Sequence, residues 1–254
     1  LEIGTTYDGF NSFNTNLWEE GQAGPVHASS SITYDGKVNI TTATTTSGQW
    51  AAKVLISKSL FNFQSQTVFE TYFEPTYTKS VEREMWVYLC PTRSASVGGE
   101  SNWLRFGIVA LFGGSEMRLT RKLNKVHVEK YKSSSITNLS SLIGIYRIVI
   151  DSSNVTFYKD GVQLWSGAHD LNFTSAYAYL LFNTKETFLS TAKFDNFRYR
   201  MSTYGNRVSQ AIDISSVKKA QASLVSWNGT TPSGTSIKVE TNLSLDGGTT
   251  WGGW

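Results

Sequence analysis

Little in this sequence supports covalent cross-links, metal cages or membrane insertion. Its 254 residues include one cysteine, Cys90, which excludes an internal disulfide, and three scattered histidines, too few to build a Cys/His zinc site. No apolar stretch approaches the ~20 residues that span a bilayer, so we expect no membrane span. Four prolines and 21 glycines argue against a collagen-like or disordered chain.

Charge is also sparse. Charged residues make up 17% of the chain and the net charge is +3, whereas an average domain is roughly 25% charged. A nucleic-acid-binding protein usually gathers its basic residues on one element, and only residues 118–122 come near to that. We therefore expect no nucleic-acid partner. Because the chain begins at Leu1 without Met or a signal peptide, we expect it to be a piece of a longer protein.

Alternation of apolar and polar residues dominates the first 200 residues, and helical periodicity is almost absent. Asp-Gly and Gly-Gly pairs that are typical of turns separate the alternating runs. We expect strands over residues 38–42, 67–74, 85–90, 104–112, 116–123, 126–131, 146–151 and 155–158. This pattern predicts an all-β jelly-roll sandwich. Composition shifts near residue 203 to a Ser/Thr-rich stretch, so we predict a first domain over residues 1–203 and a small, incomplete β-sandwich over residues 204–254.

Several motifs of the first domain resemble, in order, those of the concanavalin A-like lectin/glucanase superfamily, closest to laminarinase-type β-glucanases. They are the opening Tyr7-Asp-Gly-Phe-Asn, the turn and strand Tyr34-Asp-Gly-Lys-Val-Asn-Ile-Thr, the strand Val68-Phe-Glu-Thr-Tyr-Phe-Glu-Pro, the turn Val155-Thr-Phe-Tyr-Lys-Asp-Gly and the closing Phe194-Asp-Asn-Phe-Arg-Tyr. The resemblance covers roughly residues 5–200 and implies the fold.

The catalytic motif of those glucanases is missing. Retaining members carry Glu-x-Asp-x-x-Glu on one strand, which places the carboxylates on one face. The corresponding strand, residues 101–112, contains no carboxylate. The pairs Glu70/Glu74 and Glu82/Glu84 are the alternatives, and we interpret them as surface or ligand-orienting charges. We therefore expect no enzymatic activity, with a diverged glycoside hydrolase or polysaccharide lyase as an alternative.

Alternation assigns the remaining aromatic and charged residues to faces. Met85, Val87 and Leu89 should face the core, which turns Glu84, Trp86 and Tyr88 outward. If neighbouring strands share that face, aromatic rings would stack on sugar C–H faces while charged groups orient hydroxyls. The predicted ligand-binding residues are Glu70, Tyr72, Glu84, Trp86, Tyr88, Trp103, Arg105 and Arg118. A protein–protein interface or a purely structural role for these residues stays open.

The resemblance also implies one metal site. In such glucanases a calcium ion joins the opening strand to the closing strand through acidic side chains and a backbone carbonyl. The matching positions are Asp8, Gly36 and Asp195. Oxygen ligands suit calcium, and its role would be structural.

Residues 204–254 resemble accessory sandwich modules of phage tail proteins and of bacterial surface proteins, in particular Ser244-Leu-Asp-Gly-Gly-Thr-Thr-Trp251. We accordingly expect an extracellular, cell-surface or virion-associated carbohydrate-binding module. Its partners would be a cell-surface or cell-wall polysaccharide and other subunits of the virion or surface assembly. A purely structural virion or surface-layer subunit is the alternative.

Overall fold

The computed structural model describes residues 5–63, 66–76, 82–94, 100–111 and 114–201, together with residues 244, 246, 249 and 250. The chain divides into two compact units, Leu1–Thr203 and Tyr204–Trp254. The sandwich predicted for residues 204–254 therefore lies almost wholly outside the described residues and stays a prediction. Among the described residues, no helix has the length and apolar character needed to cross a membrane.

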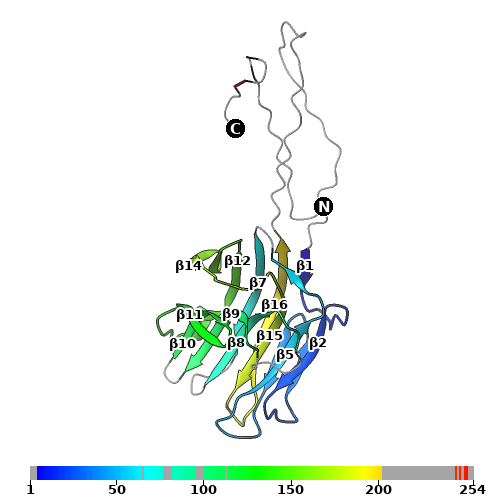
Figure 1. Ribbon diagram of the computed structural model, residues 1–254. Helices are drawn as coiled ribbons and strands as arrows, with labels where there is room; N and C mark the ends of the chain where they lie inside the picture. Colours follow the sequence, from blue (N-terminus) through cyan, green and yellow to red (C-terminus); the bar gives the residue numbers. More distant parts are fainter. Residues whose placement is uncertain are drawn as a thin grey trace. The chain divides into compact units, whose positions relative to one another are not determined.

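The first unit consists of two antiparallel sheets in two layers (Figure 1), which confirms the predicted all-β sandwich. The first sheet contains, in spatial order, β14 (Val162–Ala168), β13 (Asn154–Lys159), β12 (Gly144–Ile150), β7 (Thr67–Pro75), β16 (Ser190–Met201), β4 (Val38–Thr42) and β3 (Ser31–Tyr34), and β1 (Thr5–Asp8) pairs with β16. The second sheet contains β11 (Val126–Lys132), β10 (Gly114–Leu123), β9 (Trp103–Leu111), β8 (Arg83–Cys90), β15 (Ser175–Thr184), β5 (Ala51–Ser57) and β2 (Trp18–Ala23), and β6 (Phe61–Asn62) pairs with β15. A short 3-10 helix, η1 (Leu139–Leu142), precedes β12.

The hydrophobic core lies between the two sheets. The alternation on β8 confirms the predicted faces, because Met85, Val87 and Leu89 are fully buried in this core. On the facing sheet, Phe73 of β7 stacks on Tyr146 of β12 with ring centroids 4.6 Å apart. Burial of such rings supplies most of the favourable free energy of a sandwich of this kind.

Two central strands of the second sheet differ from the sequence prediction. β5 and β15 show no clean alternation, and the sequence analysis did not identify them. Both are buried on both faces: Leu55 and Leu180 point into the core, whereas Val54 and Leu181 belong to a second apolar cluster on the outer face. A strand that is apolar on both sides loses the period-two signal on which the prediction rested.

Gly107 marks a close backbone contact in the middle of β9. It pairs with Trp86 of β8 and with Arg118 of β10. A Cβ atom added at this position would lie 2.0 Å from the carbonyl oxygen of Met85. The strand therefore has no space for any side chain here.

We predict that Gly107→Ala lowers the free energy of unfolding by about 1–3 kcal/mol, because the methyl group forces the backbone of β8 away from β9. Urea denaturation followed by tryptophan fluorescence measures this. Gly161→Asn is the control, since its position is open and asparagine tolerates the positive φ of 80° found there. Equal stability of the two variants would contradict the close contact.

Candidate functional site

The outer face of the second sheet is unusually apolar for a surface. Alternate residues of β5, β8, β9 and β15 form a second buried cluster there, which we call the aromatic face. Its members are Ala52, Val54, Ile56, Trp86, Tyr88, Cys90, Trp103, Val109, Tyr179 and Leu181. Cross-strand pairing aligns them in rows, such as the row formed by Tyr179, Tyr88, Arg105 and Thr120.

Six of the eight residues predicted to bind ligand lie together on this outer face. They are Glu84, Trp86 and Tyr88 on β8, Trp103 and Arg105 on β9, and Arg118 on β10. Arg118 is occupied by ion pairs to Glu116 (2.5 Å) and Glu129 (3.4 Å) and does not line the cleft described below.

The placement of Glu70 and Tyr72 in the same site is wrong. Both lie on β7, which pairs with β12 and β16 in the first sheet. The Glu70 carboxylate lies 3.9 Å from the guanidinium groups of both Arg147 and Arg198, and the Lys37 ammonium lies 4.8 Å above the Tyr72 ring. The two side chains point away from the core as predicted, but alternation along a strand says nothing about which sheet the strand joins.

The Arg105 guanidinium covers the aromatic face. Its central carbon lies 4.2 Å from the centre of the Trp86 ring and 4.6 Å from that of Trp103. Its Nε donates to Thr120 Oγ1 at 3.0 Å. Because of this cover, Trp86 is only 1% exposed. The stacking role predicted for Trp86 therefore does not fit the structure.

Glu84 is held by two hydrogen bonds and lies next to a guanidinium group. Its Oε2 accepts hydrogen bonds from Trp86 Nε1 (2.9 Å) and from Asn183 Nδ2 (3.1 Å). An Arg105 nitrogen lies 3.7 Å from the same oxygen. This arrangement fixes the orientation of the carboxylate.

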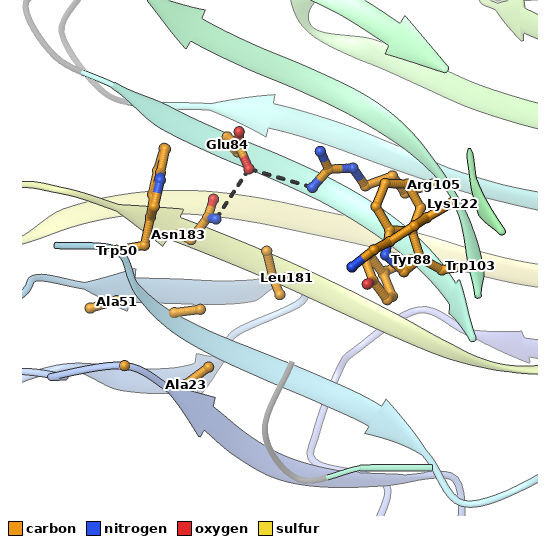
Figure 2. A pocket seen from close by; sticks show the side chains of 12 residues that line it. Ala23, Trp50, Ala51, Glu84, Tyr88, Trp103, Arg105, Lys122, Leu181 and Asn183 are labelled. Carbon is orange, nitrogen blue, oxygen red and sulfur yellow. Dashed lines mark hydrogen bonds and ion pairs between the residues drawn. The ribbon is translucent and has the colours of Figure 1, made fainter. Parts of the chain in front are cut away.

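A cleft with a volume of about 360 Å³ opens over this part of the sheet. Figure 2 shows Trp50 at one end, Arg105 and Lys122 at the other, and Glu84 with Asn183 between them. Small apolar residues form its floor: Ala23, Ala51, Ala52 and Leu181. Tyr88 and Trp103 also line the cleft, although both are largely buried.

The sequence analysis missed Trp50, Lys122 and Asn183. Trp50 is the accessible aromatic ring of the cleft, 36% exposed, and the Lys185 ammonium lies 4.8 Å from its ring centre. It directly precedes β5, and Asn183 lies near the end of β15. Both strands escaped prediction because they lack alternation, so no local signal placed these residues on the aromatic face.

The predicted calcium ligands have suitable chemistry. Asp8 is buried, and its two carboxylate oxygens accept from Phe10 N (2.8 Å) and Trp18 Nε1 (2.9 Å). Burial raises the pKa of Asp195, and the negative charges of Asp8 and Glu74 raise it further, although a hydrogen bond from Asn196 and the charge of Lys37 oppose this.

A cation between these carboxylates would relieve their repulsion, and carboxylate and carbonyl oxygens suit calcium. Among the described residues, no group of three or more His, Cys, Asp or Glu side chains is placed to hold a metal. An ion here would therefore depend on carbonyls such as that of Gly36. Calcium binding stays a prediction.

Comparison with known proteins relates the fold to carbohydrate-active enzymes. No protein-family model and no curated protein sequence matches the chain. A lichenase, a β-1,3-1,4-glucanase from a mouse hindgut metagenome, is 15% identical with a TM-score of 0.58 over 77% of this chain and 98% of its own. A Bacillus licheniformis β-glucanase is 14% identical with a TM-score of 0.56 over 78% and 99%. A Bacteroides ovatus mixed linkage glucan GH16 protein, solved with a product, is 14% identical with a TM-score of 0.55 over 77% and 99%.

These similarities confirm the concanavalin A-like jelly roll and contradict one prediction. The expectation that the chain lacks enzymatic activity is wrong, because the neighbours matched over almost their whole length are glucanases and other glycoside hydrolases. At 14–15% identity they establish the fold, not the reaction of this chain. The missing carboxylates on β9 were therefore an insufficient reason to exclude enzymatic activity.

We predict that calcium raises the unfolding temperature of the wild-type protein and not that of Asp195→Asn. With calcium the wild-type protein should have the higher unfolding temperature of the two, and with a chelator Asp195→Asn should have the higher one. The raised pKa of Asp195 means that its contribution to stability is present below its ordinary value of 3.8 and is lost as pH rises through the folded-state value. Asp195→Asn should therefore be the more stable protein at neutral pH without calcium. Thermal unfolding from pH 3 to 8, with and without calcium, tests both statements; identical calcium responses would contradict the site.

Proposed function

We propose that this protein binds a polysaccharide in the cleft between Trp50 and Arg105. The observation that carries the proposal is the lining itself, in which an accessible indole and an apolar floor lie next to fixed polar groups. A pyranose ring has apolar C–H faces that pack on such surfaces and hydroxyls that need oriented hydrogen-bond partners. A cleft of about 360 Å³ also falls within the size range of ligand sites.

Asn183 supports the proposal. Its side-chain nitrogen donates to Glu84, whereas its Oδ1 is buried and has no hydrogen-bond partner among the described residues. A buried acceptor without a partner costs about 1–3 kcal/mol. A sugar hydroxyl in the cleft would supply the missing donor, with Glu84 accepting from a neighbouring hydroxyl.

The comparisons support the same class of ligand. The similar structures are named for acting on glucans, and one of them was solved with a product. We infer that this chain also binds a carbohydrate. Adhesion to a cell-surface or cell-wall polysaccharide, as part of a phage tail or bacterial surface protein, is the setting we infer from residues 204–254. A structural subunit of such an assembly stays the alternative setting.

Glycoside hydrolysis is the second candidate, and Glu84 is the observation in its favour. It is the one carboxylate among the described residues that line the cleft, and two hydrogen bonds orient it. An oriented carboxyl group at a sugar site is the kind of group that glycoside hydrolases use as a nucleophile or as a general acid or base.

We predict that co-sedimentation with insoluble polysaccharides and bacterial cell walls retains the wild-type protein on at least one polymer. Trp50→Ala should weaken this binding by about fivefold, since an aromatic contact of this kind contributes on the order of 1 kcal/mol. Tyr158→Ala is the matched control: its ring also lies under a cation, Arg147 at 4.6 Å, but it belongs to the first sheet. Equal losses in both variants, or no retention on any polymer, would overturn the proposal.

For hydrolysis, we predict release of reducing ends from a bound polysaccharide, and a fall in kcat of about 100-fold or more in Glu84→Gln. Glu82→Gln is the control, because Glu82 lies two residues away and forms an ion pair with Lys185 outside the cleft lining. Wild-type rates in Glu84→Gln would exclude Glu84 from the chemistry.

A further inference from the structure

The charges of the cleft are unevenly distributed. Among its described lining residues, Glu84 is the carboxylate, whereas Arg105 and Lys122 carry positive charge. Figure 2 shows Arg105 and Lys122 together at the end formed by Tyr88 and Trp103, away from Trp50. We call this part the cationic end of the cleft.

Arg105 is fixed in place, but its positive charge is only partly balanced by a carboxylate. The two indole rings hold its guanidinium plane, and its Nε is used by Thr120. The nearest carboxylate, Glu84, lies 3.7 Å away, which is beyond hydrogen-bond distance. Burial lowers the pKa of Arg105; Glu84 and Tyr88 oppose this, and the positive charge of Arg118 adds to it. A guanidinium has five N–H donors, so further donors stay available to a ligand.

Lys122 extends the positive charge. The neighbouring cations Arg118, Arg121, Lys130 and Lys132 all have ion pairs with carboxylates. Lys122 has none with any residue that the structure describes. It pairs with Trp103 across the strands, which places it beside Arg105 on the same face.

His127 shows that these cations act on the same region. Its ring packs on Trp103 with centroids 5.3 Å apart, at the cationic end of the cleft. Burial lowers its pKa, followed by the charge of Arg105; Glu129 opposes this, and Lys122 and Arg118 lower the pKa further. Three cations, Arg105, Lys122 and Arg118, therefore act on this ring against one carboxylate, Glu129.

We propose that Arg105 and Lys122 bind an anionic group of the polysaccharide, either the carboxylate of a uronic acid or a sulfate ester. This inference rests on the proposed function and specifies its ligand. The planar donors of arginine match both oxyanions, and the two indole rings fix them in advance, which reduces the entropy lost on binding. Lys122 supplies a second, more mobile positive charge. The sugar ring itself would lie over the apolar floor towards Trp50.

Affinity gel electrophoresis with two matched pairs of polymers tests the inference. Polygalacturonate is compared with its methyl ester, and dextran sulfate with dextran, so that the two members of each pair share a backbone and one of them lacks the anionic groups. The variants are Lys122→Gln and, as the control with the same loss of charge, Lys58→Gln, whose side chain is exposed and does not line the cleft.

We expect one charged polymer of the panel to retard the wild-type protein more than its neutral counterpart. Lys122→Gln should weaken binding to that charged polymer by about tenfold, because it removes a hydrogen bond between charged groups. Lys58→Gln should leave the binding unchanged. Raising the salt concentration to ~0.5 M should also weaken binding of the charged polymer, because salt screens the attraction between charges. Preference for polygalacturonate identifies a carboxylate, and preference for dextran sulfate identifies a sulfate.

Each of the following results overturns the inference. Equal losses in Lys122→Gln and Lys58→Gln would show non-specific attraction to a polyanion. Neutral polymers bound as tightly as charged ones would exclude an anionic group while leaving the proposed function intact. If no polymer of the panel binds but the Trp50 experiment shows retention on a neutral polysaccharide, the inference alone falls. If no polymer binds in the electrophoresis and none retains the protein in the co-sedimentation, the proposed function is wrong as well.

Discussion

The second sheet buries apolar side chains on both of its faces, and the architecture of the cleft depends on this. One face of an antiparallel sheet is usually left to solvent. Here that face carries Trp86, Tyr88 and Leu181, each less than 5% exposed. The Arg105 guanidinium covers two of the rings on this face, those of Trp86 and Trp103. A charge over an indole is favourable in itself, and it leaves polar donors on top of an apolar surface. The cleft is the part of this face that the charged side chains leave uncovered.

The sequence predicted those features that alternate along a single strand. On β8 the inward residues and the outward Trp86 and Tyr88 face as expected, and Trp103 and Arg105 of β9 lie on the same outer face. What it could not predict is decided by pairing between distant segments. Glu70 shares the outward direction of Glu84 along its own strand, yet β7 joins the other sheet. Asn183 reaches the site only because β15 lies beside β8, and the burial of both faces of β15 hid it from analysis of alternation.

The error about catalysis has a related cause. The search for carboxylates followed one strand, whereas the face of a sheet extends across strands as well as along them. Val109 of β9 pairs with Glu84 on one side and with Glu116 on the other. Carboxylates therefore flank the strand that lacks them. Carboxylates on adjacent strands can lie as close together as carboxylates along one strand, since neighbouring strands are only about 4.8 Å apart.

The central position of β16 has a consequence for how the protein folds during synthesis. This strand pairs with β1, β4 and β7, so that Thr5 lies opposite Arg200 and Thr67 opposite Met201. At a translation rate of roughly 5–20 residues per second, the earliest strands wait about 10 seconds or more for their partner. Until then, β4 and β7 expose unpaired edges that can join other chains. The first sheet can be completed only after almost all of this unit has left the ribosome, which makes the nascent chain a natural client for chaperones.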